Sequence, residues 1–170
     1  QLNVRAFDAA GNLSNYSTST FTFDITPTVT RTTTVADGSI LASVQVIRGT
    51  GTDSGTYASG YQNVQISAAQ VADNTCWDGV AFAAVCPKFI DVTSFSGLTY
   101  VEWKYDTPVI PWASGSFYRI NIRGTDRSAN MELSYSTRTF KFDNTPPDTS
   151  VALPPEWPAS GEARNTSSTC

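Results

Sequence analysis

The stretch Phe140-Lys141-Phe142-Asp143-Asn144-Thr145-Pro146-Pro147 decides the fold of this chain. Phe140 and Phe142 share one face of an extended strand, because side chains alternate between the two faces of a strand. Two prolines follow, and since neither can donate a backbone N–H to a neighbouring strand, the strand ends there. A similar stretch occurs earlier, as Phe21-Thr22-Phe23-Asp24-Ile25-Thr26-Pro27. A strand and its exit that occur twice indicate repeated modules.

The similarity extends to the strand and the loop that come before this stretch. Each copy has an alternating apolar strand followed by a short polar loop, residues 8–12 in the first copy and residues 126–130 in the second. Val4 matches Ile122 at an offset of 118 residues, and Phe21 matches Phe140 at an offset of 119. A period of this length is too long for a solenoid and typical of an array of domains.

The two copies divide the chain into three parts. Residues 1–26 are expected to be the C-terminal strands of a preceding repeat, residues 27–146 one complete repeat, and residues 147–170 the start of a following repeat or a linker. About seven short strands with turns between them, and no sustained helical period, predict an all-β sandwich for the complete repeat. The incomplete parts need strands from neighbouring repeats or identical subunits, because uncovered strand edges invite aggregation. The Gly-rich residues 49–60 are interpreted as a plain loop.

Composition and charge exclude several function classes. The net charge of −4 and the pI near 4.6 argue against nucleic-acid binding, which needs a basic surface. No run of about 18 apolar residues predicts membrane insertion. The chain has no histidine, so it cannot form a Ser-His-Asp or Cys-His catalytic site, and we do not expect an enzyme. A carboxylate pair of the glycosidase type is formally possible, but solvated strand residues are the simpler interpretation of Asp91, Glu102 and Asp106.

Two of the three cysteines flank a turn signal. Cys76 and Cys86 lie on either side of Asp78-Gly79, a dipeptide that suits a tight two-residue hairpin turn. If the two arms pair, a Cys76–Cys86 disulfide becomes possible, and two buried thiols are the alternative. A disulfide favours an oxidising, extracytoplasmic location. The third cysteine, Cys170, is left for another partner or stays free.

Several of these segments resemble a known family. Residues 4–12 resemble the penultimate strand and loop of bacterial immunoglobulin-like repeats, and residues 142–147 resemble their inter-repeat junction. Trp77-Asp78-Gly79, with Trp103 further on, is similar to the middle of such repeats in very large secreted bacterial proteins. The resemblance implies an immunoglobulin-like β-sandwich in tandem, extracellular or on the cell surface, and in some members calcium at the junctions. Ala129 departs from the pattern, because the first copy has Gly11 in its place.

Oxygen-bearing side chains near the two junctions are candidate calcium ligands, since calcium prefers six to eight oxygen ligands and tolerates irregular geometry. They are Asp8, Asn12, Asp24, Asp126, Asn130 and Asp143. The alternative is that these residues only form turns through bonds to their own backbone. In a sandwich, the loop before the last strand and the end of that strand lie at opposite poles. Each loop set is then expected to meet the preceding or following module instead.

The predicted function is a structural extracellular repeat module, a stalk, spacer or filament subunit whose partners are neighbouring repeats or identical subunits. The alternative is an adhesin or lectin-like module that recognises a surface glycan or a protein through its loops. Trp77 and Trp112 lie near turns and are the candidate ligand contacts. Trp103 alternates with Val101 and Tyr105, so we expect it in the core.

Overall fold

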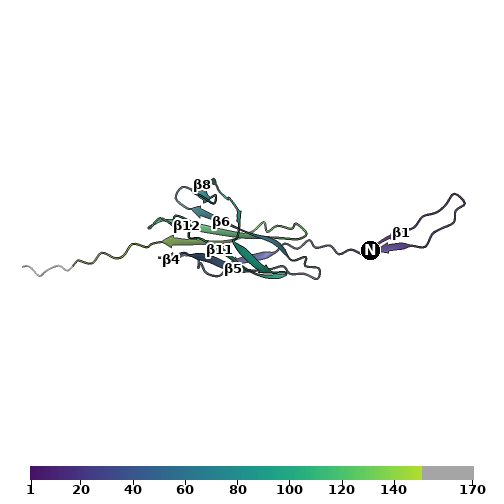
Figure 1. Ribbon diagram of the computed structural model, residues 1–170, viewed down its shortest axis with the longest axis horizontal. Coiled ribbons are helices and arrows are strands. Elements are labelled where there is room, and N and C mark those ends of the chain that lie inside the picture. The colour runs from purple at the N-terminus through teal and green to yellow at the C-terminus, as the bar shows by residue number, and fades with distance from the viewer. Residues whose placement is uncertain (151–170) are drawn as a thin grey trace, which may run out of the picture.

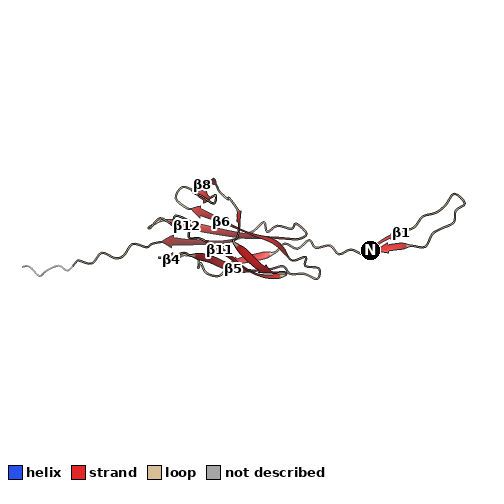
Figure 2. Cartoon of the chain, viewed as in Figure 1, coloured by secondary structure: helices blue, strands red, loops and turns tan. Residues whose placement is uncertain are grey.

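The computed structural model describes residues 1–150, and within them the chain is built from strands and loops without a helix (Figures 1 and 2). The strands are β1 (Leu2–Val4), β2 (Ser17–Ser19), β3 (Val29–Thr32), β4 (Ser39–Leu41), β5 (Val46–Thr52), β6 (Tyr61–Gln70), β7 (Thr75–Trp77), β8 (Phe82–Val85), β9 (Ile90–Asp91), β10 (Ser94–Gly97), β11 (Tyr100–Asp106), β12 (Phe117–Asp126) and β13 (Ser136–Phe142). Residues 1–150 accordingly contain no helical segment that could span a membrane. The all-β prediction is therefore confirmed.

The larger sheet has the strand order β4-β13-β12-β6-β7-β8, and β9 pairs with β6. The long strands β6 and β12 form its centre, and β13 lies antiparallel to β12. The alternation predicted from the sequence holds, because Tyr118, Ile120 and Ile122 are buried on the inner face of β12. The short strand β4 pairs in parallel with the end of β13, a contact that the sequence does not reveal.

The smaller sheet has the order β10-β11-β5-β3. Strand β5 runs through Gly49 and Gly51, so the Gly-rich loop predicted from residue 49 begins only after Thr52. Both glycines are needed where they stand. A Cβ at Gly49 would overlap the Trp103 ring, and one at Gly51 would overlap the Tyr61 hydroxyl. The missing side chains let these two aromatic groups lie against the backbone of β5.

The inner faces of the two sheets share one apolar core, which gives residues 28–143 a β-sandwich-like arrangement, called the sandwich below. The smaller sheet contributes Ile47, Val101 and Trp103, which is 3% exposed, as predicted. A hydrogen bond also crosses between the sheets, because the Trp77 indole N–H donates to the Tyr105 hydroxyl at 3.1 Å. The strands are more numerous than the seven predicted, mainly through the short strands β7 to β10.

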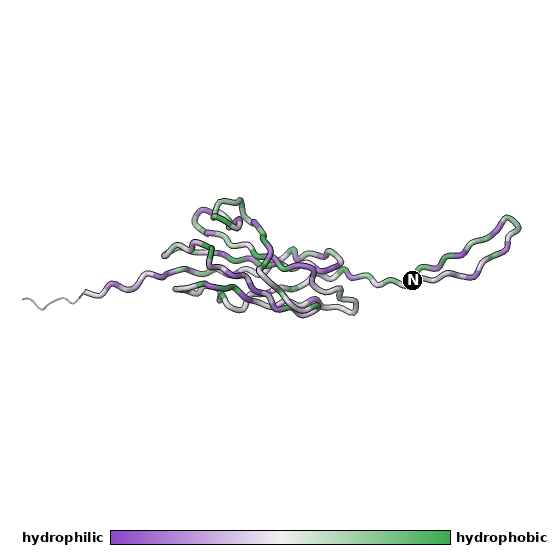
Figure 3. Tube along the Cα trace, viewed as in Figure 1, coloured by the Kyte–Doolittle hydropathy of each residue, from purple (hydrophilic) through white to green (hydrophobic). Residues whose placement is uncertain are grey.

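Strands β1 and β2 form a separate hairpin that an extended segment joins to the sandwich (Figure 1). Its apolar side chains are exposed, and Figure 3 shows apolar residues along both this hairpin and the sandwich strands. Phe21 is 64% exposed, whereas its counterpart Phe140 is fully buried. The chain leaves the sandwich at the opposite end after β13 (Figure 1). Most of the expected following segment, with Cys170, lies outside the described residues.

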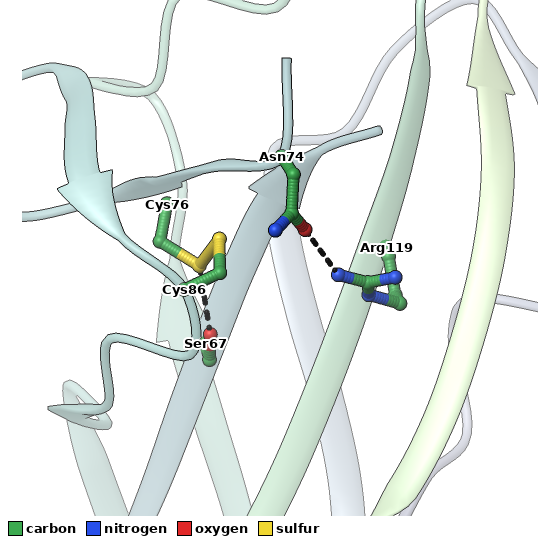
Figure 4. Close-up of a disulfide and its surroundings, with 5 residues drawn as sticks. All are labelled: Ser67, Asn74, Cys76, Cys86 and Arg119. Atoms are coloured by element: carbon green, nitrogen blue, oxygen red, sulfur yellow. Dashed lines mark hydrogen bonds between the residues drawn. A yellow bond between two sulfur atoms is a disulfide. The ribbon is translucent and has the colours of Figure 1, made fainter. Parts of the chain in front are cut away.

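The Cys76–Cys86 disulfide is present, and it crosses the base of the β7–β8 hairpin (Figure 4). The hairpin turn is wider than the predicted two-residue turn, because Trp77 faces Phe82 across it. The Asp78 carboxylate closes this wider loop by accepting hydrogen bonds from the N–H groups of Val80 and Ala81. The prediction of the bridge is confirmed, and the prediction of the turn type is wrong.

Replacing both Cys76 and Cys86 with alanine is expected to lower the free energy of unfolding by about 2–3 kcal/mol. The reason is that the bridge restricts a short loop in the unfolded chain. Urea denaturation of the two proteins measures the difference. A reducing agent should destabilise the natural chain and leave the double variant unchanged. Equal midpoints for the oxidised chain and the double variant would show that the bridge does not contribute.

Candidate metal centre

The loop between β12 and β13 is organised by the Asp126 carboxylate. One of its oxygens accepts hydrogen bonds from the N–H groups of Ser128 and Asn130, both at 2.8 Å. The other oxygen accepts one from the Asn130 side-chain amide, also at 2.8 Å. Ala129 closes the loop with a φ of 67°, a left-handed conformation that is uncommon for residues other than glycine. Asp126 is fully buried, so its carboxylate is held in one position.

The loop of the hairpin, residues 8–12, has the same hydrogen-bond pattern. The Asp8 carboxylate accepts from the N–H groups of Ala10 and Asn12 and from the Asn12 side-chain amide. Gly11 has a φ of 85°. Ala129 therefore adopts the same left-handed conformation as Gly11, and the difference between these two residues does not change the loop. In the hairpin the Asn12 side chain and its backbone N–H, acting in that order, lower the pKa of Asp8.

Asp53 lies just beyond the end of β5, at the pole of the sandwich where the chain enters. It is 5% exposed, and one of its oxygens accepts a hydrogen bond from the Gly60 N–H at 2.6 Å. Its other oxygen, Oδ1, is buried and has no hydrogen-bond partner within residues 1–150. An unpartnered buried carboxylate oxygen is costly, so it points to a ligand that would complete it.

Asp24 brings a third carboxylate to the same place, from the segment that joins the hairpin to the sandwich. Its two side-chain oxygens accept hydrogen bonds from the N–H groups of Thr26, at 3.0 Å, and Ser59, at 2.8 Å. Its backbone carbonyl accepts one from the Asn130 side-chain amide at 3.0 Å. The end of the first sequence copy is thus fastened to two loops of the following sandwich.

Carboxylate oxygens of Asp24, Asp53 and Asp126 lie within 4.8 Å of one another. Within the described residues, ion pairs join only Lys104 to Asp106 and Lys141 to Asp143, so none of the three has a cationic partner within 4 Å. Three like charges this close repel one another strongly when buried. A cation between them would convert this repulsion into attraction.

The pKa values of two of these carboxylates are shifted, in opposite directions. Burial raises the pKa of Asp53 above its ordinary value of 3.8, and the charges of Asp24 and Asp126 add to the increase, although the Gly60 N–H opposes it. The pKa of Asp24 is lowered, first by the Thr26 N–H and then by Ser59. A neighbouring positive charge would therefore favour the ionised form of Asp53.

The oxygen set fits calcium. Each carboxylate oxygen can accept more than one interaction, so the hydrogen-bonded oxygens of Asp24 and Asp126 keep the capacity to bind a cation. Calcium binds oxygens at 2.3–2.6 Å, so two ligands on opposite sides of the ion are about 4.6–5.2 Å apart. The oxygens of this cluster are no more than 4.8 Å apart, so one ion could reach all three carboxylates. The unpartnered Asp53 oxygen supplies a ligand that no hydrogen bond occupies.

The six residues predicted as calcium ligands are distributed over three places. The structure brings together Asp24 and Asp126, which come from different predicted sets, and places Asn130 beside them as the residue that positions the Asp24 carbonyl. Asp8 and Asn12 lie in the hairpin loop. Asp143 lies at the opposite pole, where Lys141, then the Thr145 N–H, lowers its pKa.

Asp53 was missed because the Gly-rich segment was interpreted as a plain loop. A usable signal was present in the sequence. An aspartate directly follows a strand that runs to the pole where Asp126 also ends its strand. Recognising that signal requires knowing which strand ends share a pole, and this depends on the sheet order.

The two tryptophans predicted as ligand contacts lie in the packing of the sandwich. Trp77 is 1% exposed, so it cannot serve as a surface platform. Trp112 is half-buried, and its ring packs edge-on against Tyr118 at 4.7 Å and against Phe140 at 5.5 Å. A residue near a turn can still face inward, which is what happens here.

The three carboxylates considered for a hydrolytic pair lie on two different sheets. Asp91 is in β9 of the larger sheet and accepts hydrogen bonds from two side-chain amides, while Glu102 and Asp106 are in β11 of the smaller sheet.

Comparisons with protein families, with curated proteins and with solved structures gave no match to this chain.

Proposed function

We propose that the chain is part of an extracellular structural protein in which immunoglobulin-like β-sandwich repeats are joined in tandem and a calcium ion stabilises each junction. The observation that carries this proposal is the meeting of Asp24 with Asp53 and Asp126. Asp24 ends the first sequence copy, whereas the other two belong to the following sandwich. An ion bound by all three would link consecutive repeats directly.

The repeat itself is supported by the comparison of the two copies. Asp8 and Asp126 make equivalent hydrogen bonds in their loops, at nearly equal distances. Val4 is 56% exposed in the hairpin, whereas the matching Ile122 is fully buried in the sandwich. The hairpin therefore has the side chains of a core without the strands that would cover them. Neighbouring repeats or identical subunits are the partners that would supply this cover.

The shape supports a spacer. The chain enters the sandwich at one pole and leaves it at the other, so repeats joined in this way would extend along one axis (Figure 1). Asp24 and Asp143 occupy equivalent sequence positions at these two poles, and each accepts a hydrogen bond from the N–H two residues later. The disulfide favours an oxidising compartment, and calcium sites of extracellular modules commonly bind in the 10⁻⁴–10⁻³ M range.

Isothermal titration of calcium into the metal-stripped chain tests the proposal. One binding event is expected, and Asp24→Asn should weaken it at least about tenfold, because the ion loses one of its three charged ligands. Asp143→Asn is the matched control, since it makes the same change at the opposite pole and should alter the affinity less than about twofold. Equal affinities for the natural chain and the Asp24→Asn variant would overturn the proposed junction site.

A further inference from the structure

A second polar site lies on the outer face of the larger sheet, away from the metal centre. It is a hollow of about 320 Å³ where β12 and β13 meet the loop that precedes the Cys76–Cys86 disulfide. Its lining includes Arg119 and Asn121 from β12, Thr137 from β13, and Asn74 and Tyr135 from the flanking loops. Figure 4 shows Asn74 and Arg119 side by side near the disulfide. No acidic side chain lines the hollow.

The Arg119 guanidinium provides an uncompensated positive charge. Its Nη2 donates one hydrogen bond, at 2.9 Å, to the Asn74 side-chain carbonyl. Both ion pairs found in residues 1–150 use lysines, so no carboxylate lies within 4 Å of this guanidinium. An arginine has five N–H donors in a planar fork, so most of them are available to an incoming anion.

Asn121 adds a buried polar group to the same hollow. It is only 5% exposed, and its side-chain carbonyl accepts a hydrogen bond from the Thr137 hydroxyl at 2.9 Å. Its side-chain N–H₂ makes no hydrogen bond to the described residues and is not among their buried unpartnered atoms, so it is accessible to solvent. An accessible amide donor of this kind is available to a ligand or to water. The hollow thus combines a guanidinium with an amide donor that is fixed by its neighbour.

The aromatic ring of Tyr135 lies along one side of the hollow. The Tyr135 ring packs edge-on against Phe89 at 5.3 Å, and the Arg123 guanidinium lies 3.9 Å from the centre of the Phe89 ring. Arg123 is held in turn by two hydrogen bonds to the side-chain carbonyl of Gln65. Tyr135 remains 36% exposed, so part of its surface is available for contact with a ligand ring. This arrangement offers a pre-positioned aromatic edge beside hydrogen-bond donors.

A second hollow, of about 270 Å³, adjoins the first, with Tyr135 and Thr137 in the lining of both. It adds Arg31 and Arg138. Its acidic lining residue, Glu132, is 7% exposed, and its two oxygens accept hydrogen bonds from the Thr30 and Gly124 N–H groups. The accessible side chains along the two hollows are therefore basic or neutral, so the surface complements an extended negative ligand.

We propose that the Arg119 hollow binds a carboxylate-bearing sugar ring, as part of an acidic oligosaccharide that continues along the adjoining hollow. The guanidinium would bind the carboxylate, the Asn121 amide and the Thr137 hydroxyl would bind ring hydroxyls, and Tyr135 would contact the apolar face of the ring. This site is independent of the junction calcium and of the repeat architecture. It would give a structural repeat an adhesive surface on a sheet face, away from the loops that carry Asp24, Asp53 and Asp126.

Nuclear magnetic resonance titration of the full chain with sodium glucuronate tests the proposal, with glucose, sodium acetate and sodium sulfate as parallel probes at constant ionic strength. Glucuronate should shift the signals of Arg119, Asn121 and Tyr135 and bind at least about tenfold more tightly than glucose or acetate. Arg119→Gln should weaken glucuronate binding at least about tenfold. Arg48→Gln, which removes the same charge from an exposed position on β5 of the other sheet, should leave it unchanged.

Each other outcome contradicts part or all of the assignment. If acetate or sulfate binds as tightly as glucuronate, the hollow is a simple anion site and the sugar assignment is wrong. If glucose binds equally well, the role of the Arg119 charge is wrong. If none of the probes shifts these signals, the hollow is not a binding site. Tyr135→Ala separates the ring contact from the charge, because it should weaken glucuronate binding and leave acetate binding unchanged. Thermal melting of each variant verifies that it is folded.

Discussion

Replacing Trp77 with alanine is expected to lower the free energy of unfolding by about 3–5 kcal/mol. The indole is 1% exposed and packs against Phe82, with ring centroids 5.7 Å apart. Its N–H also donates to the Tyr105 hydroxyl on the opposite sheet. The substitution therefore leaves a large cavity and removes a hydrogen bond between the sheets, so the buried hydroxyl loses its partner. A loss of this size is a large share of the stability of an ordinary domain.

Urea denaturation followed by far-ultraviolet circular dichroism measures this loss without relying on tryptophan fluorescence. Val85→Ala is the matched control, because Val85 lies in the same hairpin and is 90% exposed. Its effect should stay within about 0.5 kcal/mol. If Trp77→Ala also cost less than about 1 kcal/mol, Trp77 would not be a core residue. The sequence-based prediction that Trp77 contacts a ligand would then have to be considered again.

Calcium is expected to raise the melting temperature of the metal-stripped chain by on the order of 10 °C once its concentration reaches about 100 times the dissociation constant. A ligand that binds only the folded state then adds about 2.7 kcal/mol, which corresponds to a shift of this size for a domain of ordinary length. Asp53→Asn removes the carboxylate with the unpartnered oxygen and should abolish most of the rise. Asp143→Asn should retain it. An equal rise in the Asp53→Asn variant would mean that calcium acts elsewhere.

The rise in melting temperature that calcium causes should be larger at high pH than at low pH. The pKa of Asp53 is raised in the folded chain, so without metal its contribution to stability is fully present below pH 3.8 and is lost as the pH rises through the raised pKa. Calcium binds the ionised carboxylate. The rise in melting temperature should therefore be largest above that raised pKa and should shrink as the pH falls through it. Thermal melts at pH 7 and pH 4, with and without calcium, make the comparison.

Much of the fold could be predicted because alternation is a local property of the sequence. Strand β13 ends at Phe142, before the two prolines of the repeated stretch, and the apolar positions of β12 face the core as expected. The loop pattern around Asp126 could also be predicted, since its carboxylate bonds within five consecutive residues. Local spacing could not reveal the parallel pairing of β4 with β13, because that contact joins residues about 100 positions apart in the sequence.

Only part of the candidate metal centre could be predicted from the sequence, and calcium binding there stays a prediction. Its three carboxylates come from three distant segments, and they meet because β5, β12 and the incoming chain reach the same pole of the sandwich. Sequence spacing gave Asp24 and Asp126 but not their grouping with Asp53. The direction in which Trp77 faces was likewise undetermined, because an adjacent turn does not specify which face of a short strand is buried.

The most direct test of the account asks whether calcium fastens the incoming segment to the sandwich. Heteronuclear nuclear Overhauser effects of the Ile25 and Thr26 amides report the order of this segment on the picosecond to nanosecond timescale. The account predicts that saturating calcium raises these values towards those of the β12 amides in the natural chain, but not in the Asp53→Asn variant. Calcium binding that leaves the order of Ile25 and Thr26 unchanged, or that raises it equally in both proteins, would contradict a junction held by Asp24, Asp53 and Asp126.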